Sequence, residues 1–495
     1  MKGDRVIRRP GSGGYRRSGV MVNETGSQNT NDKTDEINIL KSRDDPKPVY
    51  FGKTGETGFK LRIGTECSWL KADESFGSDK LRPRIEPWLT ALVQSEYLSL
   101  LLGSGLTHSV HWIAKGSCLP GMEKAEFSVF QPQIDKAATA TAKAAKREKA
   151  NFEDQIRVAN ELLSGLEHYC LQTDTSEDFE KLRKDIKQLR KNISQALNNF
   201  AKSILEGERS IASTDEFKRE EAFGYLVNFL MSFASRTGTR DRLQIFTTNY
   251  DRLIEAGAEV AGLHLLDRFV GNLTPIFRSS RLNIDMHYNP PGIRGEPRYL
   301  EGVARFTKLH GSVDWVQVGR DIRRMGLPFG ADSVEPYLNA PGLQDTAAGN
   351  LIIYPNSAKD RETAAYPYVE LFRDFAAAVC RPNNTLVTYG YSFGDEHINR
   401  VIEDMLTIPS THLVIISYDD PMGRIMKTYE KIARPAQMTL LVGNHLGDLK
   451  TLVDHYLPKP AIDRTTFRMA ELLKARLGTE QAGKSDDEAV GGEEK

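Results

Sequence analysis

Short apolar runs alternate with helix-like segments along the second half of the chain. The apolar runs have the length of β-strands, and most of them end in polar loops: Leu243–Thr248, Phe306–Leu309, Leu351–Tyr354, Thr385–Tyr389, Leu413–Ser417 and Met438–Val442. Helical spacing of apolar residues fills several of the gaps, as in Tyr368–Val379 and Glu396–Leu406. Strands that alternate with helices are typical of a parallel sheet covered on both faces. The pattern therefore predicts an α/β fold with a Rossmann-like, doubly wound parallel sheet.

One more apolar run, Tyr97–Leu102, lies much earlier in the chain. It leads into Gly103-Ser104-Gly105, and a helix is predicted to begin directly afterwards. Continuous apolar strands of this kind belong in sheets that are buried on both faces. We therefore assign residues 46–135 to an N-terminal segment that contains the first strand of the sheet and a glycine loop.

Between these two parts, residues 136–240 have a different character. An Ala/Lys-rich helix is expected over Lys136–Lys149, and apolar residues recur at helical spacing in Phe152–Leu171 and Leu182–Leu205. These segments predict a helical insertion domain, after which residues 241–460 complete the core. Coiled-coil pairing within the insertion is compatible with the pattern, but the heptads are irregular.

Residues 1–45 carry few large apolar side chains, and the C-terminal stretch from about Gly478 is acidic and rich in Gly. Residues 1–45 are basic and rich in Gly, Ser and Asn, and residues 461–495 are expected to form a helix followed by an acidic tail. Such compositions bury too little surface to offset the entropy of ordering, so both tails are predicted to be disordered.

Composition narrows the function classes. The net charge of -1 excludes a strong overall attraction to nucleic acid or to a membrane. No apolar stretch approaches the ~20 residues of a membrane span, and a signal peptide is not apparent. The four cysteines are scattered without a C-x-x-C pair, so neither a disulfide framework nor a cysteine-based metal site is expected. A cytoplasmic protein fits these features.

Three polar loops follow predicted strands and carry the candidate chemistry. They contain Asn249 (in Thr247-Thr-Asn-Tyr-Asp251), His310 (in Leu309-His-Gly-Ser312) and Asp395 (in Gly390-Tyr-Ser-Phe-Gly-Asp395). In open α/β sheets, the loops after the carboxyl ends of the strands line the ligand crevice. The three loops therefore predict one site built from distant segments.

Each residue also has a purely structural explanation. Gly103-Ser104-Gly105 would serve as a tight turn, because His108 replaces the third glycine of a dinucleotide-binding fingerprint. Asn249 would cap the next helix, His310 would be a hydrogen-bonded strand-end histidine, and Asp395 would stabilise a helix N-terminus. In the functional alternative, His310 is a general base and Asp395 contacts a ribose hydroxyl.

Taken together, the motifs resemble the sirtuin-like NAD-hydrolysing proteins of bacterial antiphage defence systems. The motifs that carry the resemblance are Gly103-Ser-Gly105, Thr247-Thr-Asn-Tyr-Asp251, Leu309-His-Gly-Ser312, Ile353-Tyr-Pro355 and Gly390-Tyr-Ser-Phe-Gly-Asp395 with Glu396-His-Ile-Asn399. The resemblance covers about Leu98–Lys115 and Gln244–Leu449. It departs from the usual Gly-Ala-Gly loop at Ser104 and at Leu106-Thr107.

The resemblance implies roles for these residues. Asn249 would hold a water and the nicotinamide ribose, and His310 would act as the general base. The remaining NAD contacts would come from Gly103, Ser104, Gly105, Thr248, Asp251, Ser392 and Asp395. For Asp251, support of the loop and capping of the next helix are equally compatible. NAD would be the substrate, and no metal is expected.

Protein-deacylating sirtuins carry a zinc ribbon with two C-x-x-C pairs, which this sequence lacks. Water is therefore the favoured nucleophile, and the expected products are nicotinamide and ADP-ribose. The resemblance also implies homo-oligomers and a separate sensor partner, favouring a HerA-type hexameric ATPase. A non-catalytic module that senses NAD or ADP-ribose is the main alternative. ADP-ribosyl transfer and deacylation are less favoured.

Overall fold

The computed structural model describes residues 37–42, 45–55, 58–71, 73–117, 119, 124–144, 150–171, 177–236, 241–280, 284–288, 298–344, 346, 351–353 and 366–459. The chain divides into two units, 1–35 and 36–495, and every described residue lies in the second. The disorder predicted for residues 1–36, the predicted C-terminal helix and tail at 461–495, and the Tyr354-Pro355 motif residues lie outside the described residues.

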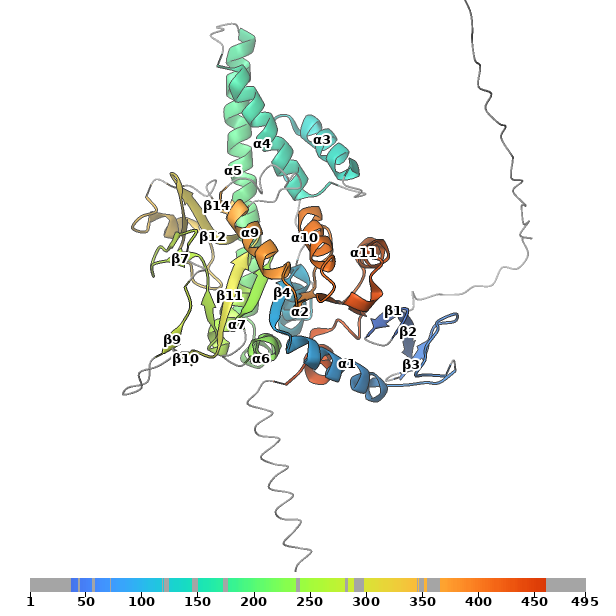
Figure 1. Cartoon of the computed structure of the whole chain (residues 1–495). Coiled ribbons are helices and arrows are strands. Elements are labelled where there is room, and N and C mark those ends of the chain that lie inside the picture. Colours follow the sequence, from blue (N-terminus) through green and yellow to red (C-terminus); the bar gives the residue numbers. More distant parts are fainter. Residues whose placement is uncertain are drawn as a thin grey trace, which may run out of the picture. The chain divides into compact units, whose positions relative to one another are not determined.

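A large sheet forms the centre of the described chain (Figure 1). Its order is β3-β2-β1-β17-β16-β15-β4-β5-β11-β6. The strands are β1 (Ile37–Lys41), β2 (Val49–Thr54), β3 (Gly58–Leu61), β4 (Tyr97–Leu102), β5 (Leu243–Thr247), β6 (His264–Leu266), β11 (Val303–Lys308), β15 (Asn384–Tyr389), β16 (His412–Ser417) and β17 (Met438–Val442). The seven strands from β17 to β6 are mutually parallel. The predicted Rossmann-like α/β fold is confirmed.

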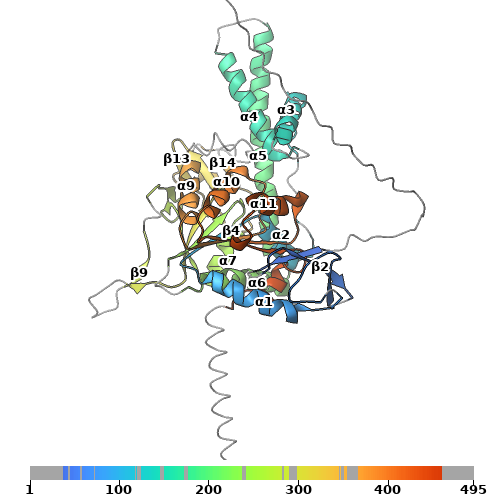
Figure 2. The same cartoon turned by 45° about the vertical axis from the view of Figure 1, so that its right-hand side comes forward.

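Helices cover both faces of this sheet (Figure 2). Successive strand residues point to opposite faces, so that Val414 and Ile416 of β16 join one apolar core and Leu413 and Ile415 join the other. The first core is covered by α1 (Ser78–Val93), α2 (Ser104–Lys115), α6 (Glu216–Ala234), α7 (Leu253–Ala261) and α12 (Leu449–Thr451). The second is covered by α9 (Tyr368–Val379), α10 (Glu396–Leu406) and α11 (Arg424–Ile432).

Strands β1 to β3 extend the sheet in antiparallel fashion beyond β17. The prediction of disorder up to residue 45 is therefore wrong for Ile37–Lys41, and Tyr97–Leu102 is not the first strand. The short apolar segment Ile37–Leu40 is ordered because it pairs with two neighbouring strands and buries Ile39 and Leu40. Because the residues around it are mostly polar, the composition of this region did not predict the strand.

A second, antiparallel sheet follows the order β14-β12-β13-β8-β7. Its strands are β7 (Phe269–Val270), β8 (Ile276–Phe277), β12 (Gly311–Val318), β13 (Asp321–Arg324) and β14 (Leu351–Ile353). A separate pair joins β9 (His287–Tyr288) to β10 (Arg298–Tyr299). The run at Leu351 therefore forms a strand, but it lies outside the parallel sheet.

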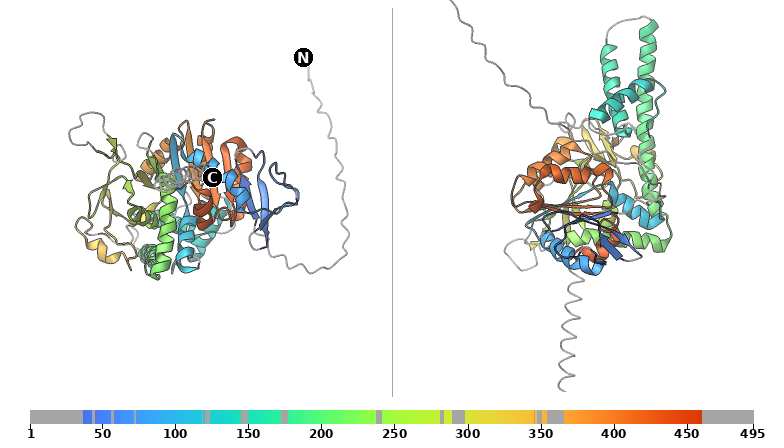
Figure 3. Two further views of the ribbon diagram at one scale, coloured as in Figure 1. Left: turned by 90° about the horizontal axis from the view of Figure 1, so that it is seen from below. Right: turned by 90° about the vertical axis from the view of Figure 1, so that its right-hand side faces the viewer.

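The predicted helical insertion consists of α3 (Gln131–Ala144), α4 (Phe152–Tyr169), α5 (Glu177–Ala212) and α6. Helices α4 and α5 lie side by side (Figure 3). Their apolar residues share a core with Val313 and Val316 of β12, so that the insertion packs on the second sheet. Helix α6 differs, because it packs against α2 and α7 and belongs to the helical layer of the main sheet.

Candidate functional site

A cavity of about 500 Å³ opens where β4, β5, β11 and β15 end. This position agrees with the rule that ligands bind beyond the carboxyl ends of parallel strands. Of the residues predicted from the sequence, those that line the cavity are Gly103, Ser104, Thr248, Asn249, Asp251, His310, Ser392 and Asp395. The structure thus brings three distant loops together. Gly105 alone among the predicted residues lies outside the lining.

The glycine loop is shaped by close contact with the loop after β15. A Cβ atom on Gly103 would lie 2.3 Å from the carbonyl oxygen of Gly390, and one on Gly105 would lie 2.5 Å from the Cα atom of Gly390. Gly390 itself has a φ of +61°. The amides of Gly103 and Gly105 donate to the carbonyl oxygens of Tyr389 and Gly390, respectively. These glycines are therefore needed for the approach of two backbones, whatever ligand the cavity holds.

Asn249 does not cap the following helix, whose N-terminal cap residue is Arg252. Instead, its side-chain amide nitrogen donates to the carbonyl oxygen of Gly103 at 2.9 Å and to the hydroxyl of Thr107 at 3.0 Å. Because a carbonyl oxygen can only accept, the contact with Gly103 fixes which end of the amide is the nitrogen. Both N–H groups of Asn249 are used in this way, and its side-chain oxygen remains as an acceptor in the cavity wall.

Asp251 supports the same loop. One carboxylate oxygen accepts from the hydroxyl of Thr107 at 2.8 Å, and the other accepts from the amide of Leu253 at 3.1 Å, in the first turn of α7. Asp251 therefore joins α2 to the loop and satisfies an amide of α7. Nearby, burial lowers the pKa of His108, with Asp251 opposing the shift, and this favours a neutral imidazole in the cavity wall.

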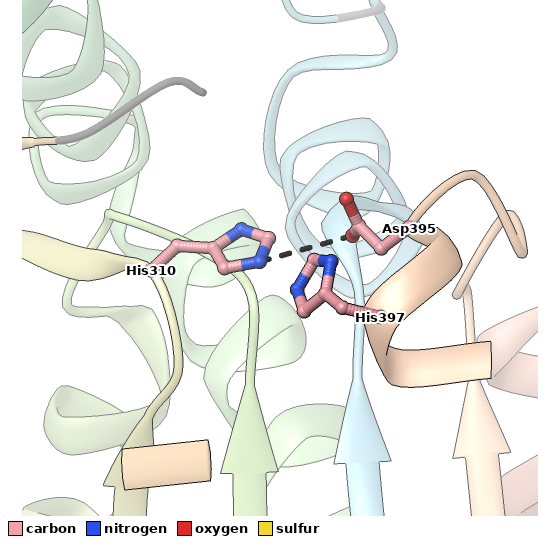
Figure 4. A group of neighbouring side chains, drawn as sticks. All are labelled: His310, Asp395 and His397. Atoms are coloured by element: carbon pink, nitrogen blue, oxygen red, sulfur yellow. Dashed lines mark ion pairs between the residues drawn. The ribbon is translucent and has the colours of Figure 1, made fainter. Parts of the chain in front are cut away.

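His310 lies in the turn from β11 to β12, and only 6% of its surface is exposed. Its Nε2 atom is 3.9 Å from a carboxylate oxygen of Asp395 (Figure 4). Asp395 is the N-terminal cap residue of α10, but its side chain makes no capping hydrogen bond. Its carboxylate faces His310 across the cavity. His397, in the first turn of α10, completes a group of three side chains.

Helices α4 and α5 provide another wall of the cavity. Glu153 of α4 lines the cavity and accepts a hydrogen bond from Tyr250, whose pKa burial raises well above its usual value. Phe200 of α5 packs edge-on against the ring of Tyr250, with 5.6 Å between the ring centroids. The loop that carries Asn249 is thus in direct contact with the helical insertion.

A buried ion pair fastens α5 to this loop. The carboxylate of Glu208, 3% exposed, accepts from the backbone amide of Arg252 at 2.7 Å and from its guanidinium. The guanidinium also donates to the carbonyl oxygens of Leu327 and Pro328. Burial raises the pKa of Glu208 and Arg252 opposes the rise. Helix α5 therefore positions the segment that follows Asn249.

Sequence reasoning missed Arg424, His397 and the cavity residues of α4 and α5. Arg424 is the only arginine or lysine among the described residues that line the cavity. Its guanidinium lies beside Gly394, close enough that a Cβ atom there would be 3.2 Å from Nη1. An anionic substrate has one obvious cationic partner in such a wall. The motif Glu396-His-Ile-Asn399 contained His397, whereas no local pattern indicated Arg424 or Glu208.

Comparison with known proteins supports a sirtuin-like family. Residues 243–434 match the family model described as a SIR2-like domain. The matched range contains Asn249, His310, Asp395 and Arg424, while the glycine loop and the helices of the insertion precede it. Such a domain suggests an NAD-dependent activity. No curated protein matches the chain. In the part of the chain that the structure describes, we find no helix with the length and apolar character needed to cross a membrane.

Proposed function

We propose that this protein hydrolyses NAD⁺ at the bond between nicotinamide and ribose, giving nicotinamide and ADP-ribose. The observation that carries the proposal is the fixed side chain of Asn249, whose two N–H groups are held by Gly103 and Thr107. Its oxygen remains available to accept a hydrogen bond from a water or a ribose hydroxyl, in the same cavity as His310. A buried histidine and an oriented acceptor are the two groups that this reaction requires.

The chemistry is suited to such a small set of groups. Nicotinamide in NAD⁺ is a cationic leaving group, so no acid has to protonate it. The bond between C1 of the ribose and the ring nitrogen breaks with both electrons passing to nicotinamide, and the transition state resembles an oxocarbenium ion. The oxygen of water then bonds to C1, and His310 accepts the proton that this water loses. Asn249 would orient that water and the ribose.

Water rather than an acylated lysine is the proposed nucleophile. The sequence lacks the paired C-x-x-C motifs of deacylating sirtuins. In the same cavity, α4 and α5 contribute Glu153, Phe200 and Ile204 to the wall beside the Asn249 loop. A helical wall at this position favours a closed reaction space over a channel for a protein substrate.

The proposal is tested by incubating the full chain with NAD⁺, with and without the protein encoded beside it, and measuring nicotinamide and ADP-ribose. We expect equal amounts of both products, and loss of both in Asn249→Ala and in His310→Ala. NAD⁺ that binds but is never cleaved would instead indicate a sensor. ADP-ribose attached to protein, or deacylation of a peptide, would indicate transfer chemistry.

We further propose that the activity depletes cellular NAD during antiphage defence, in the cytoplasm, and is released by a sensor partner such as a HerA-type hexameric ATPase. The resemblance of the motifs is the support for this setting, and the helical insertion offers surface for homo-oligomer contacts. Light scattering after size-exclusion chromatography, alone and with the ATPase, tests assembly. A monomer in both samples would contradict it.

A further inference from the structure

Three side chains with metal-binding atoms meet at one end of the cavity. His310 comes from the turn after β11, whereas Asp395 and His397 come from the start of α10 (Figure 4). One potential ligand atom from each lies within 4.8 Å of the other two. Nε2 of His310 and a carboxylate oxygen of Asp395 are 3.9 Å apart.

The elements that carry these side chains are well anchored. The turn with His310 joins β11, which pairs with β5 and β6, to β12, which pairs with β13 and β14. The ring of His397 packs edge-on against Phe372 of α9, with 4.6 Å between the ring centroids. Asp395 stands at the cap position of α10 without making a capping bond, and its carboxylate is turned toward the histidines instead.

The ligand types select the class of cation. Two imidazole nitrogens with one carboxylate oxygen form the set typical of Zn²⁺ sites that keep further positions open, and imidazole favours such borderline ions over Mg²⁺ or Ca²⁺. With metal–ligand distances of about 2.1 Å, two ligands of a tetrahedral ion lie roughly 3.4 Å apart. All three potential ligand atoms lie within 4.8 Å of one another, so side-chain rotations that shorten these separations by up to about 1.4 Å would complete the site.

We propose that His310, Asp395 and His397 form an inhibitory site for a borderline divalent cation, for which Zn²⁺ is the probe. The inhibitory part rests on the proposed NAD hydrolysis. A bound ion would occupy the nitrogen lone pair that His310 needs as a base. Its positive charge would also oppose the positive charge that develops on the ribose in the transition state. Cation binding would thus hold the hydrolase inactive without blocking the remainder of the cavity.

Binding is tested first, without reference to activity. The full chain is stripped with a chelator, and Zn²⁺ is titrated in competition with a chromophoric chelator. Co²⁺ is titrated in parallel to record the absorption of a protein-bound ion. We expect one tight site per chain and an affinity at least about 100-fold weaker in His397→Ala and Asp395→Asn, since loss even of supporting residues costs 10–100-fold.

Two controls keep the binding test decisive. His168→Ala removes a histidine from the exposed side of α4 and should leave Zn²⁺ affinity unchanged. His397→Gln tests the same ligand with a side chain closer in size, and thermal unfolding reports whether each variant is folded. Equal Zn²⁺ affinity in wild type and in folded variants of both His397 and Asp395, or no binding by the wild type, would overturn the proposal.

Activity then tests the regulatory part. We expect Zn²⁺ to abolish nicotinamide release by the wild type, a chelator to restore it, and His397→Gln to require at least about 100-fold more Zn²⁺ for the same fractional inhibition. A chain that binds Zn²⁺ through these ligands but never cleaves NAD⁺ would refute the hydrolase and leave the cation site standing. An active hydrolase that Zn²⁺ binds without inhibiting would refute the inhibitory role.

Discussion

Replacement of Glu208 should loosen the loop that carries Asn249, although the two residues lie on different elements. Glu208 is 3% exposed, and its carboxylate accepts from the backbone amide and the guanidinium of Arg252. In Glu208→Ala, that guanidinium stays buried without its hydrogen-bonded carboxylate partner, and breaking a buried pair in this way costs about 3–5 kcal/mol. Glu208→Gln keeps one oxygen for the amide, so we expect a loss of roughly 2 kcal/mol, within the range for hydrogen bonds to charged groups.

The neighbouring residue provides a matched control. Arg209 also forms an ion pair, with Asp332, but the two side chains are 46% and 82% exposed. Arg209→Ala should therefore lower the free energy of unfolding by at most ~1 kcal/mol. Urea unfolding measures the free energy of unfolding of the Glu208 variants and of Arg209→Ala. Hydrogen exchange of the backbone amides at 249–252 should accelerate only when Glu208 is replaced.

The catalytic rate should fall when the loop that carries Asn249 is displaced. A displacement of about 1 Å in a positioning group can cost ~100-fold in rate, so a kcat at least ~10-fold lower is expected for Glu208→Gln. Equal losses of stability in Glu208→Gln and Arg209→Ala, with unchanged exchange at 249–252, would show that Glu208 does not hold this loop.

Three other predictions concern the glycine loop, the partly buried His412 and Arg424 in the cavity wall. Gly103→Ala places a Cβ atom 2.3 Å from a carbonyl oxygen, so urea unfolding should show a loss of about 1–3 kcal/mol and NAD cleavage should fail. Gly224→Ala, which meets nothing within 4 Å in its helix, should instead gain up to ~1 kcal/mol. Burial lowers the pKa of His412 from 6.5 to about 4. Its contribution to stability is therefore present above pH 6.5 and lost as the pH falls toward 4, by up to about 3 kcal/mol. Between these pH values, the free energy of unfolding should depend less on pH in His412→Gln than in the wild type. An equal pH dependence in the two proteins would exclude this histidine as its cause. Arg424→Ala should raise the KM for NAD⁺ by about 10–100-fold, the equivalent of one hydrogen bond to a charged group, with kcat nearly unchanged. Lys427→Ala, exposed on the same helix, should not change KM, and equal KM values in both variants would exclude Arg424 as a substrate contact.

The sequence was most informative where local patterns determine the structure. Apolar runs such as Leu413–Ser417 are buried on both faces, so their composition alone indicates strands of a covered parallel sheet. Because parallel strands end at one edge, the loops with Asn249, His310 and Asp395 could be placed together before any contact was known. Assignment of roles to these residues came from the resemblance of their motifs.

Tertiary contacts account for what the sequence did not reveal. Glu208 lies in a long amphipathic helix, and nothing near it in the sequence indicates a buried arginine 44 residues away. Arg424 starts an otherwise ordinary surface helix and reaches the cavity only because α11 begins beside Gly394. Strand β1 is short and surrounded by polar residues, and pairing with β17, some 400 residues away, is what orders it.

The proposed hydrolysis is tested by the products that the full chain forms from NAD⁺ in the presence of its activating partner. We expect one nicotinamide for each free ADP-ribose, and no detectable release of either product in Asn249→Ala, which should still bind NAD⁺. Nicotinamide release that persists in Asn249→Ala, or a wild-type chain that releases none under any condition, would contradict it.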